Sequence, residues 1–444
     1  MTRRQLGYGL RLLVFVTTCG AVGHAQSVQL QKLLASPPTR GDYFAARVSL
    51  NGDVALLGSP EAHFDLPSVT SGEAHVFRYG ADGSWGREAI LRPASVTRAV
   101  SFGMGVSVSG AVAVVAGYEN QACTDKPLCI RGAAWVFRYD YVTRTWNEEQ
   151  ELAPADAATI SLADWQDQVG PFVSISGNVI ILGLHFDASR GPNTGAAYVY
   201  RFDGHQWQSE QKLTAQAPSS GAWFGLEVAV QGDVAVVGAF LDSPNLFLRP
   251  AVANAGSAEV FRYDGRQWNR EQVLLPYWDG QAGDLFGASL AINGDVIVVG
   301  AVDAHDKGPQ SGAAYVFRYN KAWGMWFQEQ KLTASDGAPQ EEFARSVSVN
   351  GGVLLIGGYR DNTLGARSGS VYVFRYVGKR WVQQEKLNAS DEQTGDRFGR
   401  SISLSGDIAL ICAYKRDDAC PGETDVDACN SGAAYLFAIR APRP

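Results

Sequence analysis

One pattern of about 55 to 61 residues repeats along this chain of 444 residues, and seven copies can be aligned. The clearest copy spans residues 286–332. It starts with Phe-Gly, continues as alternating apolar residues, turns at Asn-Gly-Asp and ends in a segment that begins with Trp. The period is set by that Trp, which recurs at Trp85, Trp146, Trp207, Trp268, Trp326 and Trp381. A fixed period of this length indicates a repeat architecture, in which each copy is one unit that packs on its neighbours.

Each copy contains four segments with strand character, which we name A to D in chain order. They are rich in Val, Ile, Phe and Tyr, and Gly, Asn, Asp and Ser separate them. No segment between them has helical periodicity. Four-stranded antiparallel units repeated around an axis are the blades of a β-propeller. The repeat therefore predicts an all-β fold: a seven-bladed propeller of four-stranded antiparallel blades.

The ends of the sequence predict how the ring closes. The seventh copy has segments A, B and C, but no D segment follows before Pro444. Residues 29–33, Gln-Leu-Gln-Lys-Leu, match the D segment Gln-Glu-Gln-Lys-Leu at 328–332. An unpaired sheet edge invites aggregation, so an N-terminal strand that completes the last blade has a physical advantage. We expect residues 26–444 to form this single domain as a monomer.

The first residues read as a targeting signal. Three arginines lie among the first eleven residues, and the apolar run 12–16 follows them. The segment ends at Ala25 with small residues at the positions that define cleavage. This predicts a signal peptide over residues 1–25, removed after Ala25, because the apolar run is too short to span a bilayer. The mature protein is then exported to the periplasm, the cell surface or the medium. Lipid attachment at Cys19 is the rival interpretation.

Charge and composition limit the partners. The chain is 46% hydrophobic and 19% charged, as in soluble globular proteins, and its net charge is −7. No basic stripe runs along any segment, which argues against nucleic acid as a partner. No further apolar run reaches membrane length, so we expect no transmembrane segment.

Cysteine spacing suits an exported protein. Cys123 and Cys129 bracket one B–C loop, and Cys420 and Cys429 bracket another. Disulfides across both loops are therefore predicted, since an oxidising compartment permits them. Cys412 replaces the Gly that segment B carries in other copies, and we expect a buried, inert thiol there.

The motif at the start of the copies resembles the FG-GAP repeat. It is carried by Phe102-Gly103, Phe224-Gly225, Phe286-Gly287 and Phe398-Gly399, with Val-Gly-Ala following at residues 237–239 and 299–301. This is the repeat of the integrin α-subunit propeller and of many bacterial exported proteins. The resemblance covers the mature chain blade by blade and implies the propeller fold. It does not imply one function, because propellers host unrelated activities.

Integrin-type blades often hold calcium between segments A and B, and this chain departs from them there. Every copy has a short turn containing Gly, as two-residue hairpins require. A single Asp after the Gly (Asp53, Asp233, Asp295 and Asp407) cannot supply the six to eight oxygens that calcium prefers. We expect no cofactor, and we expect these Asp side chains to bond the turn backbone. Asp425 and Asp427, in the Cys420–Cys429 loop, are the open alternative for calcium.

Function is predicted on the face that carries the long B–C and D–A loops, because a rigid scaffold presents binding residues on loops. Its carboxylates suggest a cation or a basic partner, with solvated loops as the simpler interpretation. The Trp and Tyr that recur in strands are expected to pack between blades instead. The candidate ligand-binding residues are the loop side chains Trp165, Trp223, Trp278, Asp303, Asp306 and Asp361.

No catalytic motif is found: there is no Gly-x-Ser-x-Gly, no His-Glu-x-x-His and no phosphate loop. The sequence therefore favours a non-enzymatic propeller that presents its loop face to a protein or glycan partner. A polysaccharide-acting hydrolase or lyase on the same scaffold is the alternative.

Overall fold

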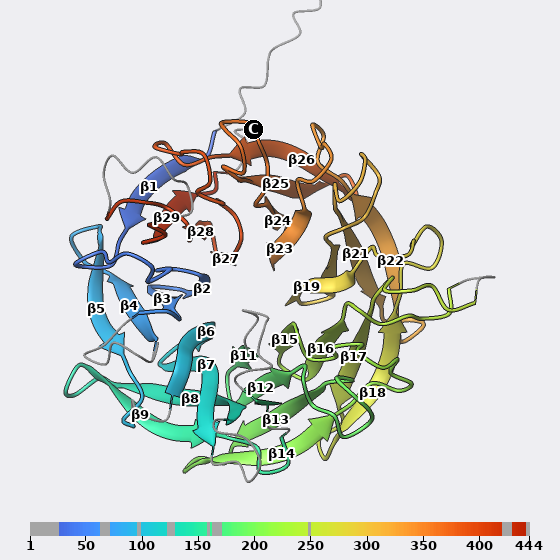
Figure 1. Cartoon of the computed structure of the whole chain (residues 1–444), viewed down its shortest axis with the longest axis horizontal. Helices are drawn as coiled ribbons and strands as arrows, with labels where there is room; N and C mark the ends of the chain where they lie inside the picture. Colours follow the sequence, from blue (N-terminus) through green and yellow to red (C-terminus); the bar gives the residue numbers. More distant parts are fainter. Residues whose placement is uncertain are drawn as a thin grey trace, which may run out of the picture.

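A computed structural model describes residues 26–62, 72–95, 99–121, 129–157, 160–161, 171–246, 250–419 and 429–440. Their strands form seven antiparallel sheets set around a central axis (Figure 1). Six sheets have four strands, and the two-residue strand β10 (Ile160–Ser161) adds a fifth to the sheet of blade two. The predicted seven-bladed propeller of four-stranded blades is confirmed.

Each blade runs from an inner strand beside the axis to an outer strand on the circumference. The inner strands are β2 (Arg47–Asn51), β6 (Ala99–Ser109), β11 (Phe172–Ser176), β15 (Val228–Gln231), β19 (Phe286–Asn293), β23 (Phe343–Asn350) and β27 (Ile402–Ser405). The second strands are β3 (Val54–Ser59), β7 (Val112–Gln121), β12 (Val179–Leu184), β16 (Val234–Ala239), β20 (Val296–Ala301), β24 (Val353–Gly358) and β28 (Ile408–Ala413). The third strands are β4 (Glu73–Tyr79), β8 (Cys129–Asp140), β13 (Ala196–Phe202), β17 (Ser257–Tyr263), β21 (Ala313–Asn320), β25 (Ser370–Val377) and β29 (Ala433–Ala438). The outer strands are β5 (Trp85–Leu91), β9 (Thr145–Leu152), β14 (Trp207–Leu213), β18 (Trp268–Leu274), β22 (Met325–Leu332), β26 (Arg380–Leu387) and β1 (Val28–Leu33).

The last blade is completed by the N-terminal strand, as predicted. β1 pairs antiparallel with β29, and Leu33 lies opposite Ala434. Ser27, just before β1, donates from its backbone N and its Oγ to the carboxylate of Glu385 in blade six, at 2.8 and 2.6 Å. On the other side, Gln31 exchanges two hydrogen bonds with the backbone of Trp85 in blade one. β1 therefore joins three blades at once.

The repeated Phe-Gly pair holds neighbouring blades in contact. In blade four, Phe224 is buried edge-on against Phe261, and its N–H donates to the carbonyl of Thr194 in blade three at 3.0 Å. A Cβ on Gly195 would collide with the carbonyl oxygen of Phe224, and a Cβ on Gly183 would collide with that of Gly225. Glycine recurs at these positions because two backbones touch there.

The repeated Trp also links blades, and the prediction that it packs between them is confirmed. Gln150 Oε1 accepts from the backbone N–H of Trp207, and Gln150 Nε2 donates to its carbonyl, both at 2.8 Å. The Trp207 indole donates to Glu149 at 3.1 Å. The same Gln–Trp exchange joins Gln31 with Trp85, Gln211 with Trp268, Gln272 with Trp326, and Gln330 with Trp381.

The prediction for the Asp residues of the A–B turns is wrong where the structure records their partners. Asp53 and Asp295 accept hydrogen bonds from Arg78 at 2.9 Å and Arg318 at 3.0 Å, on the third strand of the same blade. The contact to a turn backbone comes instead from the residue before the Gly, as when Asn293 accepts from the N–H of Gly351 in the next blade. Each carboxylate binds an Arg on the third strand of its blade, and the residues of the turn alone do not predict that contact.

The two predicted disulfides involve Cys123 and Cys420, which lie outside the described residues, so both bonds stay predictions. Cys412 is buried and free, as predicted, and burial raises the pKa of its thiol, which disfavours the reactive thiolate. Alkylating denatured mature protein should therefore label one thiol before reduction and five after it. Counting the labels by intact mass tests this, and three or more labels before reduction would contradict the two bonds.

Candidate functional site

Loop length separates the two faces of the ring. First and second strands are joined by two-residue turns, such as the one between Asn51 and Val54. Longer connections join the second strand of each blade to the third, and each outer strand to the next inner strand. These connections lie on the opposite face. We call this second face the loop face. Among the described residues, no helix has the length and apolar character needed to cross a membrane.

Several loop-face carboxylates that suggested a ligand are held by lysines of the outer strands. In blade six, Lys386 Nζ lies 2.7 Å from both Asp336 and Asp361, and the hydroxyl of Tyr372 donates to Asp361 at 2.9 Å. Although burial acts in the opposite direction, hydrogen bonds from Lys386 and Thr363 lower the pKa of Asp361. Similar clusters centre on Lys212 (Asp156 and Asp187), Lys331 (Asp279 and Asp306) and Lys32 (Asp391 and Asp418).

The predicted aspartates are therefore not brought together. Asp306 and Asp361 belong to lysine clusters of different blades, and Asp303 accepts a hydrogen bond from Gln310 Nε2 at 3.2 Å. In the part of the chain that the structure describes, no group of three or more His, Cys, Asp or Glu side chains could hold a metal. Trp165, Asp425 and Asp427 lie outside the described residues.

Trp223 anchors loops rather than presenting a free ring. Its ring packs against His185 at 5.0 Å, Phe186 at 5.5 Å and Phe240 at 5.7 Å between ring centroids. Burial lowers the pKa of His185 to about 3, so this contact is between neutral rings at physiological pH. Trp223 therefore joins the connections of blades three and four.

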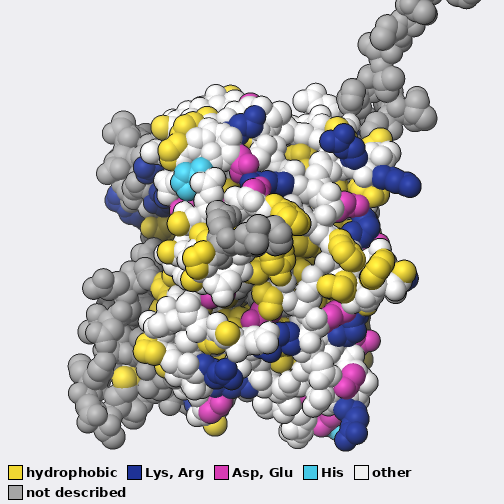
Figure 2. All heavy atoms as spheres, turned by 90° about the vertical axis from the view of Figure 1, so that its right-hand side faces the viewer, with side chains coloured by type: hydrophobic (Ala, Val, Ile, Leu, Met, Phe, Trp, Pro, Cys, Tyr) yellow, Lys and Arg dark blue, Asp and Glu magenta, His cyan; other side chains and the backbone are white. Residues whose placement is uncertain are grey.

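Trp278 lies instead in a groove on the circumference. Its side chain is 71% exposed, and the groove runs past Tyr277, Met325 and Phe327 between the outer strands β18 and β22. Figure 2 shows hydrophobic side chains gathered on this side of the ring among charged ones. Exposed aromatic faces beside amide side chains such as Gln328 suit a sugar ring. Ligand binding by Trp278 stays a prediction.

The central channel has a different character. A cavity of about 140 Å3 is lined by residues of all seven blades, and three arginines enter it: Arg47 of β2, Arg345 of β23 and Arg400 just before β27. Arg47 lies over the ring of Phe172 at 4.4 Å, and Arg400 over that of Tyr414 at 4.8 Å. Among the described residues, none of these guanidinium groups makes an ion pair. Blades six, seven and one are neighbours in the ring, so three unpaired cations converge.

The position of Arg47 beside the other two arginines is unfavourable without an anion. Burial lowers the pKa of Arg47 to about 9, and the positive charges of Arg400 and Arg345 act in the same direction. The negative charge of Glu227 acts in the opposite direction. A guanidinium keeps its proton at neutral pH, so the repulsion stays in the folded protein. The single carboxyl group among the described lining residues is Glu227 of blade four. A bound anion would relieve this repulsion.

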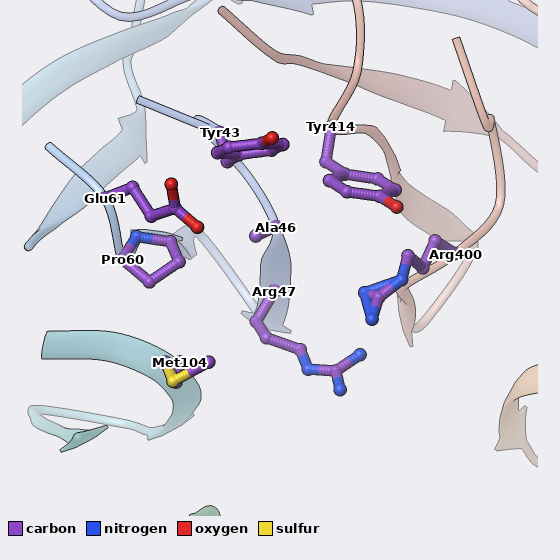
Figure 3. A pocket seen from close by; sticks show the side chains of 8 residues that line it. All are labelled: Tyr43, Ala46, Arg47, Pro60, Glu61, Met104, Arg400 and Tyr414. Carbon is purple, nitrogen blue, oxygen red and sulfur yellow. The ribbon is translucent and has the colours of Figure 1, made fainter. Parts of the chain in front are cut away.

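On the loop face, tyrosines surround a second cavity that shares Arg47 and Arg400 with the channel, and we call it the mouth. This cavity, of about 90 Å3, is lined by Tyr43, Glu61, Tyr414, Arg47 and Arg400. Figure 3 shows the two arginines extending toward one another below the tyrosine rings, which stack at 5.9 Å. The mouth therefore combines flat apolar rings with guanidinium groups.

Comparison with known families assigns the repeat. A family model described as FG-GAP repeat matches the chain six times, and the matches together cover more than half of it: residues 28–77, 146–200, 207–261, 268–317, 326–374 and 381–437. The chain belongs to the FG-GAP repeat family. Each FG-GAP match begins near an outer strand and ends in the third strand of the next blade, so the first one contains β1 to β4.

Other comparisons concern only the fold. No curated protein matches this FG-GAP chain. A Bacteroides fragilis protein, provisionally assigned as a 6-phosphogluconolactonase, has a TM-score of 0.51 at 10% identity, with 78% of this chain and 85% of that one covered. Saccharomyces cerevisiae Sqt1 has a TM-score of 0.49 at 9% identity, with 93% and 99% covered.

The FG-GAP motif carries a signal for the channel that sequence analysis missed. Arg345 and Arg400 stand two residues after the Phe of the motif, and Arg47 stands three residues after it. Other copies have Gly105, Glu227 or Ser289 at the channel, each three residues after the Phe. Residues two to four positions after the Phe line the axis of the closed ring, so arginines there in the neighbouring blades six, seven and one lie in one cavity.

Proposed function

We propose that the mature protein is an exported, non-enzymatic binding propeller whose loop face receives an acidic partner over the mouth of the arginine channel. The single observation that carries this proposal is the convergence of Arg47, Arg345 and Arg400 without an ion-pair partner among the described residues. Guanidinium groups bind carboxylates through two parallel hydrogen bonds, which suits recognition of a planar acidic group.

The proposed ligand is negatively charged, whereas the loop carboxylates of the sequence suggested a cation or a basic partner. Lysines hold several of those carboxylates within the protein, although each lysine is shared by two aspartates, whereas the charged groups that line the channel without an ion pair among the described residues are mainly positive. The tyrosines at the mouth favour an acidic glycan over an acidic peptide, because sugar rings stack on flat aromatic faces. Export rests on the predicted signal peptide, residues 1–25, which lie outside the described residues.

The test is a calorimetric titration of the mature protein with a trimer of galacturonic acid, at low salt because exposed charges are screened by salt. The methyl ester of the same trimer has no charge and serves as the matched ligand, and a glutamate oligopeptide represents acidic proteins. We expect binding of the acid and little of the ester. Equal binding of acid and ester would overturn the proposal, and preference for the peptide would replace the glycan by a protein partner.

The position of Glu227 in one cavity with the three arginines favours the enzymatic alternative. Burial, opposed by Arg47, Arg345 and Arg400, raises the pKa of Glu227 to about 7, where a general base is effective. In a lyase reaction the arginines would neutralise the uronate carboxylate, and Glu227 would take the proton from the carbon beside it. A carbon–carbon double bond would form as the bond from the next carbon to the leaving sugar oxygen breaks, and that oxygen would take a proton from water. Unsaturated product, detected by ultraviolet absorbance and abolished by Glu227→Gln, would establish the lyase; without it the binding propeller stands.

A further inference from the structure

Resting on the acidic-ligand site proposed above, we propose that Glu227 is an internal competitor for that ligand, so that an acidic group enters the channel together with a proton on Glu227. The inference concerns how the site is regulated. It requires that Glu227 face the same space as the arginines and that no other group hold its charge.

The geometry meets the first requirement. Glu227 immediately precedes β15, and its backbone carbonyl accepts from the N–H of Gly238 at 2.9 Å. Its side chain lines the same cavity of about 140 Å3 as Arg47, Arg345 and Arg400. It forms no ion pair with them in the described part of the chain. A ligand carboxylate in this space would therefore lie among the arginines and across from the carboxyl group of Glu227.

The remaining lining residues do not hold the charge of Glu227. Blades one, six and seven supply the three arginines, and the lining residues of blades two, three and five are the uncharged pairs 105–106, 172–173 and 289–290. The serines at 289, 346 and 401 add no charge. The described lining side chains therefore sum to three positive charges when Glu227 is protonated and to two when it is ionised.

Titration of Glu227 supports the coupling. Burial, with the three arginines acting in the opposite direction, raises its pKa to about 7. A second carboxylate in the cavity would raise this pKa further, because like charges disfavour ionisation. By linkage, the ligand then binds with uptake of a proton, and its affinity falls as pH rises through 7. If only the protonated form binds, the loss between pH 6 and pH 8 is about tenfold. Uronate carboxylates, with pKa values of about 3 to 4, stay ionised throughout this range.

The experiment titrates full mature protein with the galacturonic acid trimer at pH 6 and pH 8. Each titration is repeated in two buffers of different ionisation enthalpy, which counts the protons taken up. For the wild type we expect affinity about tenfold weaker at pH 8, with uptake approaching one proton per ligand near pH 8. Glu227→Gln should bind equally at both pH values, at least as tightly as the wild type at pH 6, and without proton uptake. Asp407→Asn, an exposed change of equal charge on the opposite face, should behave as the wild type.

Each outcome separates the two proposals. Binding by the wild type that is independent of pH and takes up no proton overturns the competitor role and leaves the acidic-ligand site standing. Weaker binding by Glu227→Gln than by the wild type at pH 6 also overturns it, because Glu227 would then be a ligand contact. Absence of binding by the wild type at both pH values removes the proposed function and this inference together. Melting curves confirm that the variants are folded.

Discussion

Deletion of residues 26–33 should lower the melting temperature of the mature protein by roughly 5 °C or more, or prevent folding. The deletion removes β1, which supplies the outer strand of blade seven and its contacts to blades six and one. Lost strand pairing and burial should cost about 5 kcal/mol or more. That is a large fraction of the stability of any domain. For a chain of this size, unfolding entropy converts about 5 kcal/mol into roughly 6 °C.

Two single substitutions in β1 provide a matched test. Leu33 is 2% exposed in the core between blades seven and one, whereas Leu30 on the same strand is 48% exposed. Leu33→Ala should destabilise by about 2 to 5 kcal/mol. Leu30→Ala should change stability by about 0.5 kcal/mol or less. Thermal and urea unfolding measure both.

The closure would be contradicted if the deleted protein melted within a degree or two of the mature chain. It would also be contradicted if both leucine variants behaved alike, since the docked strand must bury one side chain and expose the other.

Replacing Arg345 and Arg400 together by alanine should weaken binding of the galacturonic acid trimer by about a hundredfold or more. A hydrogen bond to a charged group contributes about 1.5 to 3 kcal/mol, and each 1.4 kcal/mol is tenfold in affinity. Neither arginine has an ion-pair partner among the described residues, so their removal breaks no ion pair there, and Glu227 can take up a proton in their absence. The fold should therefore survive, and calorimetry with the acid and its methyl ester measures the loss.

Arg380→Ala is the matched control, because Arg380 is exposed on the outer strand β26. It removes a positive charge far from the axis, so trimer affinity should stay within about twofold of the wild type if binding occurs in the channel. An equal loss in this control would mean that overall charge, rather than the channel, attracts the ligand.

Several loop residues have partners that their own loops did not predict, for one physical reason. Asp306 and Asp361 suggested ligands when only their own loops were considered, yet lysines of the outer strands bind both. Asp53 suggested a turn contact, yet Arg78 binds it. A carboxylate interacts with whatever cation the fold brings nearest, and that neighbour lies outside the local pattern.

Strand order, the number of blades and the closing strand followed from the printed sequence alone. Alternation and turn residues are local features of the sequence. With seven copies, the strands assigned in one copy could be compared with those of the others. The arginine channel was not predicted, because the pattern of a copy does not show which of its side chains reach the axis, and Arg47 and Arg400 are almost at opposite ends of the chain. Glu227 joins them from blade four across the axis. Which charges meet, and which lack partners, depends on the curvature and closure of the whole ring.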